Sequence, residues 1–205
     1  DYSKLPRAQF LPQAVKFFTE SYSKQLDFCL KNQMYARVST HMGSGYARKG
    51  VPDPELAAKV YENIKSHPAL FAYTYDEPEP RRCPPEAIGK LYNAIKAVDK
   101  NHPVNINLCV RHTFKDYLKY TDIASYDFYP FPHSDLKYWQ VYNSEMLNHN
   151  PDAPFAAYLQ NFQFGTTEFP THENMYGSFV TNFINGSRSV WFFTYYAKRC
   201  FSYCC

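Results

Sequence analysis

The chain has 205 residues and a mass of 24.0 kDa, and 22 Lys and Arg residues against 19 Asp and Glu residues leave a formal net charge of +3. Charges of both signs are interspersed along the sequence, which argues against the clustered basic face of a nucleic-acid-binding protein. The hydrophobic share of 45% and the charged share of 20% are close to those of packed globular proteins. We therefore expect a single folded domain over residues 1–205.

Aromatic residues make up 19% of the chain, with 19 Tyr, 17 Phe and 2 Trp. So many rings either fill a core or line a groove that stacks on flat ligands or on the apolar faces of sugars. The composition leaves both interpretations open.

The sequence contains no apolar run of the ~20 residues that a membrane span needs, and its first residues do not form the apolar core of a secretory signal. The six cysteines show no zinc-type spacing, so we expect neither a metal site nor a cofactor. Asn185-Gly186-Ser187 has the form of a glycosylation acceptor, which favours a secreted or extracellular protein. For such a protein we predict at least one disulfide that uses the cluster Cys200, Cys204 and Cys205, with its pairing left open among the roughly 15 that six cysteines allow.

Hydrophobic periodicity divides the chain into alternating strands and helices. Apolar residues three to four apart predict a first helix over residues 12–32, and Asp53 followed by Pro54 marks the start of a second. The predicted helices cover residues 12–32, 54–64, 84–99, 114–120, 136–148 and 172–185. The predicted strands cover residues 34–40, 69–75, 104–109, 123–129, 155–162 and 189–195.

Regular alternation of strand and helix predicts a parallel sheet, either doubly wound and open or closed as a (β/α)8 barrel. No glycine-rich phosphate loop follows any strand, which removes support for a nucleotide-binding or other phosphate-handling protein. Polar clusters instead follow four strands, as expected at the mouth of a barrel: 39–41, 76–77, 127–129 and 160–161. We therefore predict an α/β fold, a partial (β/α)8 TIM-type barrel with about six parallel strands.

Residues 67–80 carry the clearest chemical signal. The apolar strand ends in Asp76 and Glu77 and is followed by Pro78, so two carboxylates stand at a rigid strand end. Their side chains point to opposite sides of the pleat. A carboxyl group held among aromatic rings has its charged form disfavoured, as a general acid at neutral pH requires. The alternative is a solvated acidic turn.

This stretch resembles the fourth strand of the (β/α)8-barrel glycoside hydrolases of the large retaining clan, whose pattern HPALxxWxxxDEP ends in the acid/base glutamate. Residues 122–130 are similar to the D-x-x-x-x-D-x-Y-P pattern of their sixth strand, and residues 94–104, 154–165, 170–173 and 186–195 are similar to neighbouring parts. The resemblance spans roughly residues 55–196, with its short pieces in the right order and spacing.

The resemblance implies a barrel that lacks its first two β/α units, to be completed by further sequence or by neighbouring protein chains. It implies that Glu77 is the acid/base residue, with Asp76 where these enzymes often have asparagine. The seventh strand departs from the pattern, because Gln160 stands where the clan usually has its nucleophilic glutamate. Asp127 or Glu168 is then left to act as the second carboxylate.

The strand ends and the resemblance also suggest residues that contact a bound oligosaccharide or glycan: His41, Tyr129, Gln160, Asn161, Trp191 and Tyr195. A solvated loop or an ordinary core position is the alternative for each. Two hypotheses follow. The domain hydrolyses a glycosidic bond with Glu77 as proton donor, or it is a non-catalytic glycan-binding or structural component of an extracellular assembly.

Overall fold

The computed structural model describes residues 6–40, 51–80, 83–163 and 168–193. His41, Tyr195 and the predicted disulfide cluster at Cys200, Cys204 and Cys205 lie outside these residues. Within them, no helix combines the length and apolarity that crossing a membrane requires.

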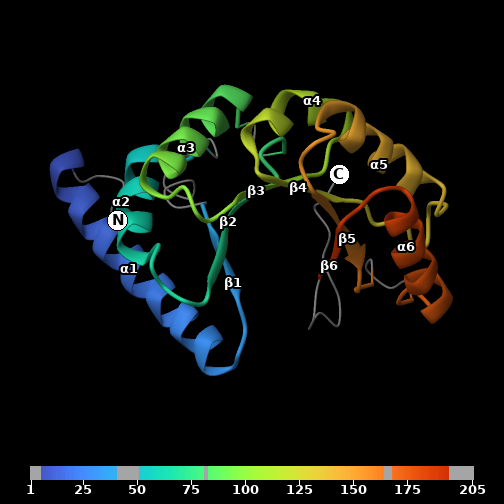
Figure 1. Cartoon of the computed structure of the whole chain (residues 1–205), viewed down its shortest axis with the longest axis horizontal. Coiled ribbons are helices and arrows are strands. Elements are labelled where there is room, and N and C mark those ends of the chain that lie inside the picture. Colours follow the sequence, from blue (N-terminus) through green and yellow to red (C-terminus); the bar gives the residue numbers. More distant parts are fainter. Residues whose placement is uncertain (1–5, 41–50, 81–82, 164–167, 194–205) are drawn as a thin grey trace. The chain divides into compact units, whose positions relative to one another are not determined.

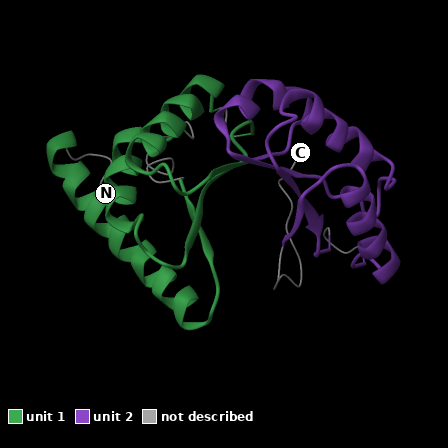
Figure 2. Ribbon diagram, viewed as in Figure 1, with its two compact units in different colours: residues 1–106 green, residues 107–205 purple. Residues whose placement is uncertain are grey.

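The chain forms two compact units, residues 1–106 and 107–205 (Figure 2). Unit 1 contains α1 (Arg7–Lys31), β1 (Ala36–Ser39), α2 (Pro54–Ile64), β2 (Leu70–Asp76) and α3 (Pro85–Val98). Strand β3 (Val104–Leu108) spans the boundary. Unit 2 contains two 3₁₀ turns (Arg111–Thr113 and Leu118–Tyr120), α4 (Phe114–Tyr117), β4 (Ile123–Asp127), α5 (Tyr138–His149), β5 (Phe155–Gln160), α6 (His172–Ile184) and β6 (Ser189–Phe193).

Among the described residues the sheet has six strands, which are parallel and follow one another in chain order, β1-β2-β3-β4-β5-β6. In a doubly wound sheet the strand order reverses at a switch point and helices cover both faces. Here the order does not reverse, and within each unit the helices lie on one face of the strands (Figure 1). The predicted fold class, a partial (β/α)8 TIM-type barrel with six parallel strands, is confirmed.

In unit 1 the helices bury apolar stripes against the sheet. Asp53 caps α2 by accepting a hydrogen bond from the Leu56 amide, and Pro54 follows at the first helical position, as predicted. The hydroxyls of Tyr22 on α1 and Tyr61 on α2 both donate to the Ser39 carbonyl, over 2.7 and 3.2 Å. Two helices are thereby tied to the carboxyl end of β1.

Helix α1 is longer than predicted, because it begins at Arg7 rather than near Pro12. The amides of Gln9 and Phe10 bond to the Pro6 carbonyl and start the first turn ahead of Pro12. The Arg7 guanidinium also pairs with Asp53 and Glu55 at the start of α2. A proline inside a helix usually breaks it, so the sequence predicted a start near Pro12. The contacts of Pro6 and Arg7 stabilise the helical turn that precedes this proline.

In unit 2, helices α5 and α6 pack on β4 around a buried polar cluster. The Tyr126 hydroxyl lies 2.5 Å from Asn143 Oδ1 and 3.0 Å from Asn182 Oδ1. Burial raises the pKa of Tyr126 well above its ordinary value, so its hydroxyl stays protonated. Tyr126 therefore points to the helical layer, and its neighbours Ser125 and Asp127 occupy the opposite face of the strand.

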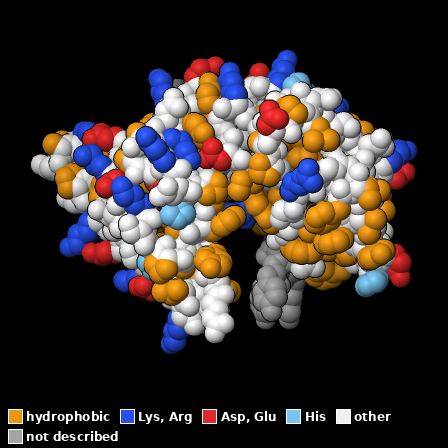
Figure 3. All heavy atoms as spheres, viewed as in Figure 1, with side chains coloured by type: hydrophobic (Ala, Val, Ile, Leu, Met, Phe, Trp, Pro, Cys, Tyr) orange, Lys and Arg blue, Asp and Glu red, His pale blue; other side chains and the backbone are white. Residues whose placement is uncertain are grey.

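Hydrophobic side chains gather over the α6 end of unit 2 (Figure 3). The large exposed members on α6 are Tyr176, Phe179, Phe183 and Ile184. A capping box at Thr171 and Asn174 starts this helix, so its beginning is defined by the local sequence.

Candidate functional site

In unit 1 the two predicted catalytic carboxylates follow one another at the end of β2. Asp76 is the last residue of the strand, and both Asp76 and Glu77 are half-buried. Glu77 has a φ of +46°, a left-handed conformation that L-residues other than glycine rarely adopt. Residues in such strained conformations cluster at active sites, ligand clamps and switch regions.

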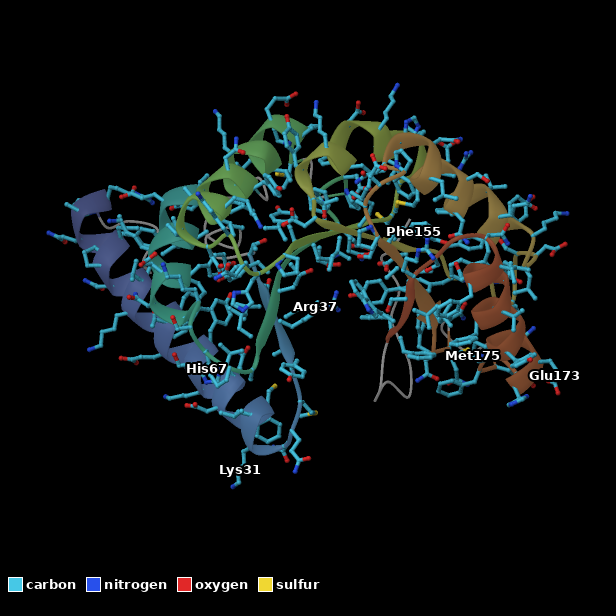
Figure 4. The ribbon with its side chains drawn as sticks, in the orientation of Figure 1. Lys31, Arg37, His67, Phe155, Glu173 and Met175 are labelled. Atoms are coloured by element: carbon cyan, nitrogen blue, oxygen red, sulfur yellow. The ribbon has the colours of Figure 1, made fainter. Side chains whose placement is uncertain are left out.

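A polar network lies beside this strand end on the face away from the helices. Asn105 Oδ1 on β3 accepts hydrogen bonds from Thr74 Oγ1 over 2.8 Å and from Arg37 Nη1 over 3.2 Å. Arg37 on β1 points away from α1 and α2 (Figure 4). Its cationic guanidinium is thus placed on the sheet face that the helices leave uncovered.

In unit 2 the register of the strands places three side chains in one row. Asp127 on β4 is the register partner of Tyr158 on β5, which is in turn the partner of Trp191 on β6. The rings of Tyr158 and Trp191 meet edge to face with centroids 5.3 Å apart. Register partners share a sheet face, and this face is opposite to that of Tyr126.

Three rings form a second group beyond this row, where the three strands end. Tyr129 and Phe162 meet edge to face at 4.9 Å, Phe162 and Phe193 at 5.6 Å, and Tyr129 stacks on Phe193 at 6.1 Å. Phe162 is buried, whereas Phe193 is 40% exposed. We call Tyr129, Phe162 and Phe193 the aromatic platform.

Gln160 lies at the end of β5 and is only 2% exposed. Its Nε2 donates to the carbonyl oxygens of Phe131 and Phe162 over 2.8 and 3.2 Å, and its Oε1 accepts from the Phe131 amide over 3.0 Å. The next residue, Asn161, donates its backbone amide to the Phe193 carbonyl over 2.7 Å. Both residues therefore connect the strand end to neighbouring chain segments.

Unit 2 thus brings together five residues that the sequence predicted for the site: Asp127, Tyr129, Gln160, Asn161 and Trp191. Asp76 and Glu77 lie in unit 1. The sequence-based prediction missed Arg37, Thr74, Asn105, Tyr158, Phe162 and Phe193. Phe193 could have been predicted from the sequence, because side chains alternate between the two faces of a strand and Phe193 lies two residues after Trp191. Phe162 belongs to the loop after β5, and the sequence offers no comparable signal for it.

A separate groove of about 880 Å³ lies between α1 and α2 in unit 1. Its walls include Leu11, Val15 and Ala58, with Lys and Glu side chains at its rim. It belongs to the helical layer and not to the strand ends. Over the described parts of the chain, no group of three His, Cys, Asp or Glu residues is arranged to hold a metal ion.

No protein-family profile and no curated protein matches this sequence. Among solved structures, the chain is similar to a putative α-L-fucosidase from Bacteroides thetaiotaomicron, with a TM-score of 0.64 and 8% identity, over 84% of this chain and 63% of that chain. It is similar to Bacteroides uniformis β-glucuronidase 2, with a TM-score of 0.60 and 11% identity, over 83% of this chain and 24% of that chain. A glycosyl hydrolase family 2 member from Bacteroides cellulosilyticus gives a TM-score of 0.54 at 13% identity, over 82% and 21%.

The chain therefore spans about a quarter of the β-glucuronidase chain and less than two thirds of the fucosidase chain. At these identities the likeness shows a shared fold alone.

Proposed function

We propose that this chain is a glycoside hydrolase-like domain that binds an oligosaccharide or glycan at the strand ends of unit 2. The observation that carries the proposal is the aromatic platform, in which a half-exposed ring, Phe193, is held by two others. The axial C–H groups of a sugar ring form an apolar face that packs on such rings. Asp127 and the Tyr129 hydroxyl supply polar groups nearby on the chain for hydrogen bonds to sugar hydroxyls.

Binding rather than hydrolysis is favoured by Gln160. In the enzymes that the sequence resembles, this position usually carries the nucleophile, and an amide cannot act as one. The amide here is also fully engaged with backbone groups of Phe131 and Phe162.

The test is to titrate the protein with a panel of oligosaccharides and phenyl glycosides that includes β-glucuronides and α-fucosides. Tryptophan fluorescence and calorimetry measure the binding. Phe193→Ala should weaken binding roughly 3- to 10-fold, the worth of one aromatic contact. Phe192→Ala is the matched control, because Phe192 is adjacent, 54% exposed and on the opposite face of β6. Equal losses in both variants, or no binding by the unmodified protein, contradict the proposal.

Hydrolysis of a glycosidic bond with Glu77 as proton donor is the second candidate. The strained backbone of Glu77 favours it, because a rare conformation at a half-buried carboxylate is typical of a functional position. The reaction needs a second carboxylate, a role for which the sequence analysis named Asp127 and Glu168. Glu77→Gln removes the transferable proton and keeps the shape, so it should reduce any glycosidase rate by about 10²- to 10⁴-fold. Activity that survives this change excludes Glu77 as the acid.

We also propose that the domain acts outside the cell and that neighbouring chains or further sequence supply the remaining β/α units of the barrel. The acceptor triplet at Asn185 and the glycan-related fold support the first part. Among the described strands, β1 and β6 stand at the two ends of the strand order, where further strands would pair, and this supports the second part.

A further inference from the structure

The side-chain amide of Gln160 acts on one backbone residue much as a neighbouring strand would. It donates to the Phe131 carbonyl and accepts from the Phe131 amide, which lies 29 residues earlier in the chain. Phe131 belongs to the loop after β4 and to none of the strands. The second hydrogen of Nε2 goes to the Phe162 carbonyl. A single amide thus joins the loop after β4 to the loop after β5.

These two loops carry two rings of the aromatic platform. Tyr129 lies two residues before Phe131, and Phe162 is itself the acceptor of the third bond. The two rings meet at 4.9 Å. Because each hydrogen bond holds the backbone of one loop, the amide sets the distance between them.

A carboxylate in this position would reverse two of the three contacts. The oxygen in the place of Nε2 carries no hydrogen and would face the carbonyl oxygens of Phe131 and Phe162 at hydrogen-bond distance in a buried place, while the other oxygen would still accept from the Phe131 amide. Burial and these two dipoles both disfavour the charged form, so the carboxyl group would be held neutral to a pH above its ordinary pKa. The neutral acid has one O–H and restores one of the two lost bonds.

We propose that Gln160 is a positioning residue of the aromatic platform and that this position requires an uncharged hydrogen-bond donor. The role in ligand binding rests on the proposed function, whereas the requirement for a neutral donor does not. The consequence for chemistry is that a glutamate at position 160 would not supply an ionised nucleophile at neutral pH.

The first test compares the unfolding equilibrium of the full chain with those of Gln160→Glu and Gln160→Ala in urea between pH 4 and pH 8. At pH 7 Gln160→Glu should raise the unfolding constant by about 10- to 100-fold, the effect of unpaired buried polar groups. The loss of stability in Gln160→Glu relative to the unmodified protein should shrink as the pH falls towards about 4.3, the ordinary pKa of a glutamate. The reason is that the pKa of this carboxyl group would be higher in the folded state than in the unfolded state. The loss in Gln160→Ala should not vary with pH.

Gln140→Glu is the matched control, because Gln140 is exposed on α5 in the same unit. A pH-independent loss in Gln160→Glu, or a loss no larger than in Gln140→Glu, overturns the requirement for a neutral donor.

The second test measures binding of the best glycoside from the panel, without urea and at a temperature where all variants are folded. Gln160→Ala should bind about 5-fold or more weakly, because only a fraction of molecules would hold the two loops in register. Binding equal to that of the unmodified protein overturns the positioning role. If no glycoside binds the unmodified protein while the pH-dependent loss is observed, the neutral-donor requirement stands and the proposed function fails.

Discussion

The Tyr73 hydroxyl donates a 2.7 Å hydrogen bond to Asp99 Oδ2, and His102 Nδ1 lies 2.7 Å from the same oxygen. Asp99 Oδ1 accepts from the backbone amides of Asn101 and His102. An Asp, a His and a Tyr in contact resemble a catalytic arrangement. This cluster lies in the turn that enters β3, at the end of the strands that serves stability rather than catalysis in barrels. We interpret it as a structural lock on the turn.

Asp99→Asn should lower the free energy of unfolding by about 2 kcal/mol at pH 7, because charge-assisted hydrogen bonds are lost. Burial raises the pKa of Asp99, but the hydrogen bonds from Tyr73, His102 and two backbone amides outweigh it and leave the pKa below its ordinary value. The stabilisation is therefore present above the unfolded-state pKa of about 3.9 and is lost as the pH falls below it. Urea unfolding at pH 7 and pH 3 checks this, and a difference between the two proteins that is as large at pH 3 contradicts it.

Asp53 both caps α2 and binds Arg7 of α1. Asp53→Ala should destabilise the protein by about 1–2 kcal/mol, the cost of a lost helix cap together with a partly exposed ion pair. Arg7→Ala should cost less than about 1 kcal/mol, because Arg7 is half exposed and the cap remains. Thermal unfolding of the two variants shows which of them loses more stability. A larger loss of stability in Arg7→Ala would show that the ion pair contributes more than the helix cap.

Tyr126→Phe should destabilise unit 2 by about 1–3 kcal/mol, because it leaves the buried amides of Asn143 and Asn182 without the phenolic hydroxyl between them. Tyr138→Phe removes a hydroxyl from a ring that is 45% exposed and should have almost no effect. Hydrogen exchange of the α5 and α6 amides measures the change locally. Equal protection in both variants would mean that the cluster contributes little.

Glu77→Gly should be more stable than Glu77→Ala by about 1 kcal/mol, because glycine adopts a φ of +46° without the steric cost that a Cβ atom brings. Both variants lack the carboxylate, so any glycosidase activity should be lost in both. Chemical unfolding and a glycoside assay on the same pair separate the two effects. A Glu77→Ala variant as stable as Glu77→Gly would show that the backbone at this position relaxes.

The amino-acid sequence by itself determined the element types and their order, because hydrophobic periodicity and the caps at Asp53 and Thr171 are local properties of the chain. The placement of polar residues at strand ends was also local information, and Asp76, Asp127 and Gln160 are the last residues of β2, β4 and β5. Parallel pairing followed from the β/α alternation, whereas the chain order of the strands, β1 to β6, is a finding of the structure.

What the tertiary structure alone decided is how these residues meet. The engagement of Gln160 with Phe131 and Phe162, and the contact of Tyr129 with Phe193, join segments brought together only by the register of β4, β5 and β6. Register depends on packing across the whole sheet, so no local pattern encodes it. The same holds for the left-handed backbone of Glu77, because a glutamate gives no sequence sign of a conformation that its surroundings impose.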